Sequence, residues 1–460
     1  AFSRYCVKRA KQYFKKGWHS VHNGISFSLK REAQRRRMRT FLLFFVFSAC
    51  LLPATALQPV VLINGLAGSN LNARLNGAKE PHVFCDKKKD WFRIWLTVEE
   101  LVPGVVDCFF HNVVVHFNNQ TKQYEDTEGV DIDGNVGWGS TKGLDYLDPS
   151  LKAGKYFHDI IKRLESIGYV DNKSLRGAPY DWRLSARGLD SKPTFSGNNN
   201  LPYFAKLKAL IEDTSVTNGG EKIHIISHSM GGPVSLAFLH RQSTDWKDKY
   251  IASLIAVSPP FGGSVKTVKA VVSGDNFDAP VVHQNIFWPV QSTCASGPWL
   301  FPQDGLWRSD EVLVETPSKN YTSADWLQLF SDMPGLSSVK LMSEETDILT
   351  NTLGEKEFVA PNVKVALIRG TDVKTEIGYT YGVDFNSLGK GKSAPPPTAI
   401  RTDNFGDGTV PNRSLARALQ WQGQQPQPVT YNVFPGASHE GILSDSNAID
   451  RIVEYVTGVL

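Results

Sequence analysis

Cysteine is scarce in this sequence, with five residues among 460. Two of them, Cys6 and Cys50, precede the region in which strands and helices are predicted. The other three permit one intramolecular disulfide, which excludes a small module stapled by several bridges. Cys85 and Cys108 are the economical pair, because they close a loop of about two dozen residues, worth roughly 3 kcal/mol through loop-closure entropy. Cys294 would then remain a free thiol.

The N-terminal region lacks an apolar run long enough to cross a membrane. Phe41–Leu52 is apolar, but a spanning helix needs roughly 20 such residues, and Pro53 follows. A basic residue before the run and Ala54-Thr55-Ala56 after it are typical of a secretory signal with its cleavage site. We predict a signal peptide at residues 38–56 and interpret residues 1–37 as an upstream extension or a disordered basic tail. An uncleaved signal anchor is the alternative.

A basic excess is absent from most of the chain, although the net charge is +4. Residues 1–40 carry twelve Lys and Arg and one Glu, which gives +11, and residues 41–56 carry no charge. The remainder, +4 − 11, is −7 for residues 57–460, so the net charge gives no indication of nucleic-acid binding there. An apolar fraction of 41% and eleven tryptophans exclude global disorder.

Complete metal and phosphate motifs are also missing. Residues 131–136 begin like a calcium loop, but Val136 stands where that loop needs glycine and Lys142 where it needs glutamate. Gly391-Lys392-Ser393 ends like a phosphate loop, yet prolines follow it in place of a helix. We therefore expect no metal and no cofactor.

Four Asn-X-Ser/Thr triplets are present, and in the secretory pathway such triplets accept glycans on surface loops. The acceptor positions are Asn119, Asn172, Asn320 and Asn412. Together with the signal peptide, they predict a glycoprotein of the lysosome or the extracellular space.

Alternating strand and helix patterns predict an α/β fold, with a mostly parallel sheet covered by helices on both faces. Short β-branched runs indicate strands and amphipathic runs indicate helices. The predicted strands are 58–65, 112–117, 222–227, 250–257, 363–369 and 428–434, and the predicted helices are 156–168, 201–214, 232–240 and 446–456. Two stretches interrupt the alternation in the domain 57–460: an insertion at about 78–110 and a cap or lid at about 262–343.

The stretch Ile223–Pro233, IHIISHSMGGP, predicts a nucleophile elbow. An apolar strand ends at Ser229 and a helix follows, with Ser227 and Gly231 two residues to either side. In such a strand-to-helix turn these flanking positions contact neighbouring strands, so only small side chains fit. The usual pattern has glycine where this chain has Ser227. Small-x-Ser-x-Gly also occurs by chance, and it is the flanking strand and helix that favour a nucleophile.

A serine hydroxyl needs a base to accept its proton, and the base needs an orienting acid. Asp407 in a glycine-flanked turn and His439 just after strand 428–434 complete the chain order Ser, Asp, His of the α/β-hydrolase fold, which we therefore predict for this chain. Alone, Asp407 could be a turn residue and His439 a solvated loop histidine; the ordered set favours a catalytic triad. For the oxyanion we predict the backbone N–H groups of Met230 and Leu66.

Several further stretches are more specific than the serine motif. They are Phe92–Leu96, Val106–Cys108, Leu147–Pro149, Arg176–Arg183 (RGAPYDWR), Ser227–Gly231, Trp246–Ile251 (WKDKYI), Ala270–Asn276 and Gly406–Thr409. Through them the sequence resembles the lecithin:cholesterol acyltransferase-like family, most closely its lysosomal phospholipase A2 branch. The resemblance implies the roles of nucleophile, acid and base for Ser229, Asp407 and His439. The lysosomal branch carries an acidic residue where this chain has Leu66.

The resemblance also implies that a Cys85–Cys108 disulfide frames a membrane-binding segment. The apolar clusters of residues 91–110 agree, since aromatic side chains on a small projection suit contact with lipid headgroups. Core packing is the alternative for these side chains. The predicted membrane-binding residues are Trp91, Phe92, Trp95 and Leu96.

We expect an enzyme that cleaves a fatty acyl ester of glycerophospholipid through an acyl-Ser229 intermediate, without calcium. The acyl group would pass to water or to a lipophilic alcohol such as ceramide. The expected partners are a phospholipid membrane surface and these lipid substrates, and not nucleic acid. A phosphatidylcholine-sterol acyltransferase is the alternative enzyme, and a non-catalytic lipid-binding protein is the alternative of another class.

Overall fold

The computed structural model describes residues 57–95, 97, 105–148, 154–195, 200–276, 284–346 and 358–459. The predicted upstream extension and signal peptide lie outside these residues, as does Leu96. Within the described ranges, no helix has both the length and the apolar character to cross a membrane.

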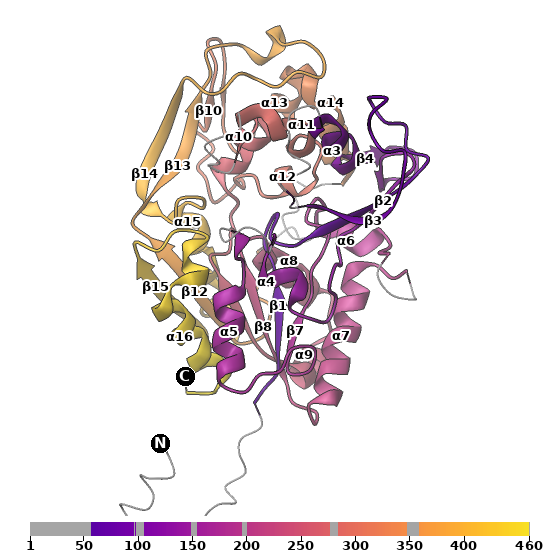
Figure 1. The fold of residues 1–460 in the computed structure, drawn as a ribbon. Helices are drawn as coiled ribbons and strands as arrows, with labels where there is room; N and C mark the ends of the chain where they lie inside the picture. Colours follow the sequence, from indigo (N-terminus) through magenta and orange to yellow (C-terminus); the bar gives the residue numbers. More distant parts are fainter. Residues whose placement is uncertain are drawn as a thin grey trace, which may run out of the picture. The chain divides into compact units, whose positions relative to one another are not determined.

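A six-stranded sheet lies at the centre of the described region (Figure 1). Its order is β15-β12-β9-β8-β1-β7 and its pairings are parallel. The strands are β1 (Val60–Ile63), β7 (Leu175–Gly177), β8 (Ile223–His228), β9 (Ile251–Val257), β12 (Val365–Thr371) and β15 (Val429–Pro435). Because β1, β8 and β12 are buried along their whole length, they read as apolar runs, as expected for strands covered on both faces.

Helices cover both faces of this sheet. The side chains of β1 alternate between two separate apolar clusters, Val61 and Ile63 in one and Val60 and Leu62 in the other. The first cluster includes side chains of α7 (Tyr203–Thr217) and α8 (Gly231–His240), and the second includes those of α5 (His158–Ser166) and α16 (Ser446–Val456). The predicted α/β class is confirmed.

The predicted strand 112–117 is wrong in its first half. Asn112 and Val113 end helix α3 (Val106–Val113), and β4 (Val115–Asn118) begins only afterwards, paired with β5 (Gln123–Asp126). Phe109, Phe110 and Val113 are buried by α3, so the β-branched run straddles a helix end and a strand start.

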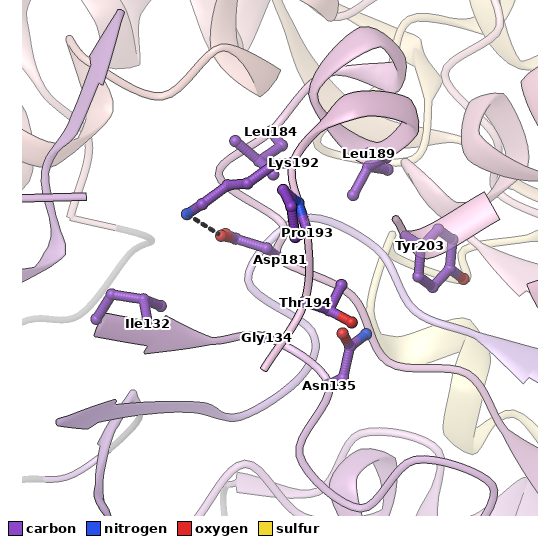
Figure 2. Close-up of a pocket in the computed structure, with 10 residues that line it drawn as sticks. All are labelled: Ile132, Gly134, Asn135, Asp181, Leu184, Leu189, Lys192, Pro193, Thr194 and Tyr203. Carbon is purple, nitrogen blue, oxygen red and sulfur yellow. Dashed lines mark ion pairs between the residues drawn. The ribbon is translucent and has the colours of Figure 1, made fainter. Parts of the chain in front are cut away.

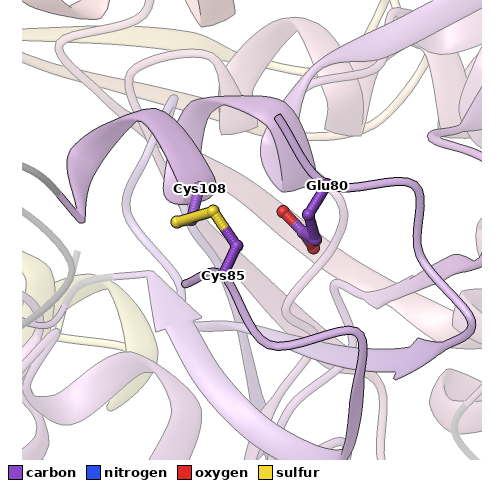
Figure 3. Close-up of side chains that lie close together, drawn as sticks. All are labelled: Glu80, Cys85 and Cys108. Carbon is purple, nitrogen blue, oxygen red and sulfur yellow. A yellow bond between two sulfur atoms is a disulfide. The ribbon is translucent and has the colours of Figure 1, made fainter. Parts of the chain in front are cut away.

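Residues between β1 and α4 (Lys142–Asp145) in the sequence form an antiparallel sheet of order β3-β2-β6. It consists of β2 (Leu71–Asn76), β3 (Lys88–Trp95) and β6 (Val130–Asp133). A disulfide joins Cys85, just before β3, to Cys108 in α3 (Figure 3). Glu80 lies beside it, and these three form the one group in the described chain with metal-ligand proximity. Since both sulfurs are in the disulfide, the group offers no thiolate.

In its described residues, the segment predicted as a cap contains five α-helices, but its sheet is completed from elsewhere. The helices are α10 (Val265–Ser273), α11 (Trp288–Gln291), α12 (Ser296–Trp299), α13 (Trp326–Asp332) and α14 (Ser337–Thr346). The sheet has the order β11-β10-β13-β14, with β10 (Val314–Glu315), β11 (Asn320–Tyr321), β13 (Val373–Thr380) and β14 (Ala399–Gly406). The β13–β14 hairpin, which the sequence did not predict, thus brings residues from after β12 into the layer above the central sheet (Figure 1). The remaining α-helices are α6 (Ala186–Ser191), α9 (Thr244–Tyr250) and α15 (Asn412–Leu415).

Candidate active site

Ser229 occupies a sharp turn between β8 and α8. Its φ of 54° lies in the left-handed region, where a non-glycine residue is strained and commonly functional. The side chain is half-buried and therefore still reachable. A Cβ on Gly231 would lie 2.5 Å from the backbone oxygen of Asn64, and Ser227 is fully buried between β1 and β9. Only small side chains fit these two positions, as the sequence pattern indicated.

The structure brings the three predicted triad residues into direct contact. His439 Nε2 lies 2.9 Å from Ser229 Oγ, and His439 Nδ1 lies 2.7 Å from Asp407 Oδ2. His439 stands in the loop between β15 and α16, and Asp407 follows β14 directly. The backbone N–H of His439 also donates to the backbone oxygen of Asp407 at 2.7 Å, which fixes the two loops to each other.

The surroundings of Asp407 and His439 favour the charged form of the histidine. Asp407 is fully buried, and burial by itself raises the pKa of its carboxyl. The charge and hydrogen bond of His439, with the N–H groups of Thr409 and Val410, reverse this and hold the pKa of Asp407 below its usual value. Burial lowers the pKa of His439, but the Asp407 charge and hydrogen bond outweigh it and raise the pKa above the ordinary value. Asp407 thus favours the imidazolium that forms when Ser229 gives up its proton.

The turn that follows β1 passes directly alongside Ser229. A Cβ on Gly65 would lie 2.6 Å from Ser229 Cβ, so this position requires glycine. The N–H of Gly65 donates to Tyr156 Oη at 2.8 Å, and Tyr180 Oη donates to the backbone oxygen of Asn64 at 2.9 Å. Among the described residues, neither the Leu66 nor the Met230 N–H has a hydrogen-bond acceptor. Both predicted oxyanion donors are therefore free to receive a ligand oxygen.

Trp95 supports this turn, which corrects its predicted contact with lipid. The side chain is only 7% exposed, and its indole N–H donates to the backbone oxygen of Ala67 at 2.9 Å. Its ring packs against Trp182 of the RGAPYDWR stretch, with ring centroids 5.3 Å apart. A ring that closes the aromatic core and fastens the oxyanion turn does not reach a membrane.

The other predicted membrane-binding residues differ in exposure. Trp91 is 37% exposed, whereas Phe92 is half-buried with the Lys89 ammonium 4.1 Å from its ring centroid. Among the described residues of this segment, the most exposed apolar side chains are Val83 and Phe84, at 96% and 61%, which the sequence prediction missed. The detectable signal was an apolar pair directly before Cys85 in an otherwise polar loop.

Three of the four predicted glycan acceptors are exposed: Asn119, Asn172 and Asn320. Asn412 is half-buried at the start of α15, and its side-chain oxygen accepts a hydrogen bond from Arg369.

A pocket away from the predicted site residues is lined in part by Asp181 of the RGAPYDWR stretch (Figure 2). Lys192 and Asp181 face each other in its wall, with 3.6 Å between Nζ and Oδ2. Burial raises the pKa of Asp181, but Arg183 and Lys192 outweigh it and bring the pKa to about 2. None of the predicted site residues lines this pocket, and Lys192 also pairs with Asp126 of β5, with 2.7 Å between Nζ and Oδ1.

Comparison with known proteins agrees over most of the chain. The lecithin:cholesterol acyltransferase family model matches residues 91–352. A lysosomal phospholipase A and acyltransferase of Bos taurus is 34% identical over 408 residues, 88% of this chain and 93% of that protein. The Homo sapiens protein of the same name is 32% identical over 419 residues, 91% and 95% of the two chains. The phosphatidylcholine-sterol acyltransferase of Homo sapiens is 31% identical over 402 residues, 87% and 85%.

Among solved structures, a chain from the crystal structure of the Tle4-Tli4 complex covers 87% of this chain and 98% of its own length. The TM-score is 0.51 at 14% identity, a similarity of fold alone. The matched family region contains the elbow of Ser229, and the sequence relatives extend the match to nearly the whole described chain. The chain belongs to the lecithin:cholesterol acyltransferase family.

Proposed function

We propose that this protein is a serine-dependent phospholipase A and O-acyltransferase. The observation that carries the proposal is the contact of Ser229 Oγ with His439 Nε2 at 2.9 Å, on a strained elbow, in a chain 34% identical to a lysosomal phospholipase A and acyltransferase. The substrate is a glycerophospholipid, from which one fatty acyl ester is cleaved.

In the acylation step, Ser229 Oγ attacks the ester carbonyl carbon while His439 Nε2 takes the hydroxyl proton. Asp407 stabilises the resulting imidazolium, and the N–H groups of Leu66 and Met230 hold the oxyanion. When the tetrahedral intermediate collapses, the bond to the leaving lipid oxygen breaks and His439 returns the proton to it. The products are an acyl-Ser229 ester and a lysophospholipid.

In the second step, His439 Nε2 takes the proton of an acceptor hydroxyl, whose oxygen attacks the acyl carbon. The bond to Ser229 Oγ then breaks, and His439 returns the proton to Ser229. With water the product is a free fatty acid, and with a lipophilic alcohol such as ceramide it is a new ester. A sterol acceptor is the alternative, supported by the 31% identity to a phosphatidylcholine-sterol acyltransferase. A purely lipid-binding role would not require three side chains aligned for proton transfer.

The membrane-facing surface in this proposal is the loop around the disulfide. Val83, Phe84 and Trp91 supply exposed apolar area, and the exposed lysines 87–89 lie between them in sequence. Apolar side chains bordered by lysines suit the interface of a phospholipid bilayer. Secretory delivery to the lysosome or outside the cell would place the enzyme at such membranes, with glycans on Asn119, Asn172 and Asn320.

The deciding experiment incubates purified protein with phosphatidylcholine vesicles that contain either ceramide or cholesterol, without calcium, at acid and neutral pH. Fatty acid together with 1-O-acylceramide supports the proposal, and cholesteryl ester supports the sterol alternative. Lipid binding without any release of fatty acid would leave only the lipid-binding alternative.

Ser229→Ala and His439→Ala are each expected to lower kcat at least about 10³-fold while the protein stays folded. Ser235→Ala is the matched control, because Ser235 is a buried serine of α8 that bonds only the backbone oxygen of Gly231. Thermal melts check folding, and equal activity of Ser229→Ala and Ser235→Ala would exclude Ser229 as the nucleophile.

A further inference from the structure

We propose that Tyr156 and His228 form a positioning network that holds the oxyanion turn, the nucleophile elbow and the loop of the base in register. The inference rests on the proposed acyl transfer and names two residues that this chemistry does not itself require. Both are buried, Tyr156 at 9% and His228 at 1% exposure, and neither touches the reacting atoms.

The network begins at the oxyanion turn. Tyr156 Oη accepts a hydrogen bond from the N–H of Gly65 at 2.8 Å. Its ring packs so closely against Gly68 that a Cβ there would lie 2.4 Å from the ring carbon Cζ. By occupying the Gly65 donor and packing under Gly68, Tyr156 fixes the orientation of the peptide units between them. The N–H of Leu66, the next donor along the turn, therefore stays free for the oxyanion.

The donors and acceptors of the rest of the network follow from its other end. Because the backbone oxygen of His439 can only accept, it takes the Nε2 proton of a neutral His228, and Nδ1 of that ring accepts the Tyr156 Oη proton, 2.6 Å away. A neutral imidazole with Nδ1 as acceptor carries its proton on Nε2. His228 Nε2 lies 2.9 Å from the backbone oxygen of His439 and donates to it. Every polar atom along the path thus has a partner, a condition in which buried networks rigidify their surroundings.

The hydrogen bonds from Gly65 through Tyr156 and His228 to His439 connect the turn after β1, the nucleophile elbow and the loop of the base. Tyr156 stands just before α5, His228 is the residue before the nucleophile, and His439 is the base. The base is held on both sides, since its N–H donates to Asp407 and its carbonyl accepts from His228. A loop held in this way keeps the imidazole within reach of Ser229 Oγ, and misplacement by 1 Å can cost about 10²-fold in rate.

His228 is also suited to remain neutral during turnover. Burial lowers its pKa to about 3, with a further contribution from His439. The two imidazole centroids are 5.0 Å apart, so a second positive charge there would oppose the imidazolium of the base. A neutral histidine, which accepts from Tyr156 at Nδ1 and donates to His439 through Nε2, fastens the loop without this cost.

The first test compares Tyr156→Phe with Tyr169→Phe. Tyr169 is also buried, and its Oη donates to the backbone oxygen of Gln58, away from the triad, so both variants lose one phenol oxygen. The rate of covalent labelling of Ser229 by a fluorophosphonate is expected to fall about 10- to 100-fold for Tyr156→Phe and to stay near wild type for Tyr169→Phe. With a soluble short-chain ester, kcat should fall while KM is unchanged. Equal labelling rates for the two variants would overturn the network.

The second test asks for rescue at His228. In His228→Gln an amide N–H can still reach the backbone oxygen of His439, whereas His228→Leu has no donor. Ser229 is expected to be labelled at least about fivefold faster in His228→Gln than in His228→Leu, because His228→Gln keeps one hydrogen bond to the loop of His439. Equal losses in two variants of equal melting temperature would contradict the proposal; if His228→Leu does not fold, the Tyr156 comparison decides.

Labelling separates this proposal from the substrate assignment. It needs only an activated serine and its oxyanion donors, and no phospholipid. If wild type is labelled at Ser229 but releases no fatty acid from phosphatidylcholine vesicles, the proposed substrate fails while the labelling rates still decide the network.

Discussion

His439 experiences two opposing influences, burial and the charge of Asp407, and the charge prevails. A base of this kind accepts the serine proton only when it is neutral. Activity should therefore fall as the pH decreases through the raised pKa of His439, and it should reach a plateau above it.

Asp407→Asn is expected to lower kcat about 10⁴-fold, because the base loses both its orientation and the charge that stabilises its imidazolium. The same change lowers the pKa of His439, so the acid limb of the residual activity should move to lower pH. A kcat/KM profile across pH measures both effects. Asp403→Asn, in β14, is the control, since Asp403 only accepts the N–H of Phe405. A fully active Asp407→Asn would require another acid.

Ser229 lies so close to position 65 that only glycine fits there. A methyl group there would press on Ser229 Cβ and lie 3.0 Å from Tyr156 Oη, so the oxyanion turn would have to move. Gly65→Ala is expected to lower kcat by at least about 10²-fold, as does loss of an oxyanion donor. Gly389→Ala is the control, because its Cβ would meet only Lys392 Cγ at 3.6 Å. Comparable activity of the two variants would show that the turn has room to spare.

At the scale of elements, the Cys85–Cys108 disulfide ties the loop before β3 to α3, across a sequence separation of 23 residues. Cys85→Ser/Cys108→Ser should lower the free energy of unfolding by roughly 3 kcal/mol, through loop-closure entropy. Because the three proposed triad residues lie on other elements, hydrolysis of a soluble ester should persist while binding to phospholipid vesicles weakens.

Chemical denaturation and vesicle sedimentation measure the two effects of removing the disulfide. Cys294→Ala is the control for loss of a sulfur, since Cys294 is buried and unpaired and burial raises the pKa of its thiol to about 12. Unchanged vesicle binding by the double variant would separate the disulfide from the membrane surface.

At the scale of the whole molecule, residues 57–460 carry a net charge of −7. Anionic lipid would repel such a chain overall, so in the proposed function apolar contacts would carry most of the attraction to membranes. Val83→Ser/Phe84→Ser is therefore expected to weaken binding to phosphatidylcholine vesicles about tenfold or more, with hydrolysis of a soluble ester unchanged. Val216→Ser is the control, because Val216 is 74% exposed on α7, away from the disulfide loop. Equal binding by both variants would place the membrane surface elsewhere.

Parts of the structure could be predicted because they depend on short-range sequence. The strand that ends before Ser229 and the helix that follows it are local patterns of apolar and small residues, and the fold class follows from their alternation. The β13–β14 hairpin was missed because β14 is largely exposed along its length and has no apolar alternation to detect. Trp95 was misassigned because aromatic content does not reveal whether a ring faces lipid or core.

The sequence by itself determined the α/β class, the order of Ser229, Asp407 and His439 and the small residues around the nucleophile, since each depends on residue type and spacing along the chain. Only the tertiary structure decided that these three side chains meet within hydrogen-bonding distance, although Ser229 and His439 have a sequence separation of 210. It alone joined Tyr156 to His228 and turned Trp95 inward. Contacts between distant segments arise from packing, and packing leaves no local pattern in the sequence.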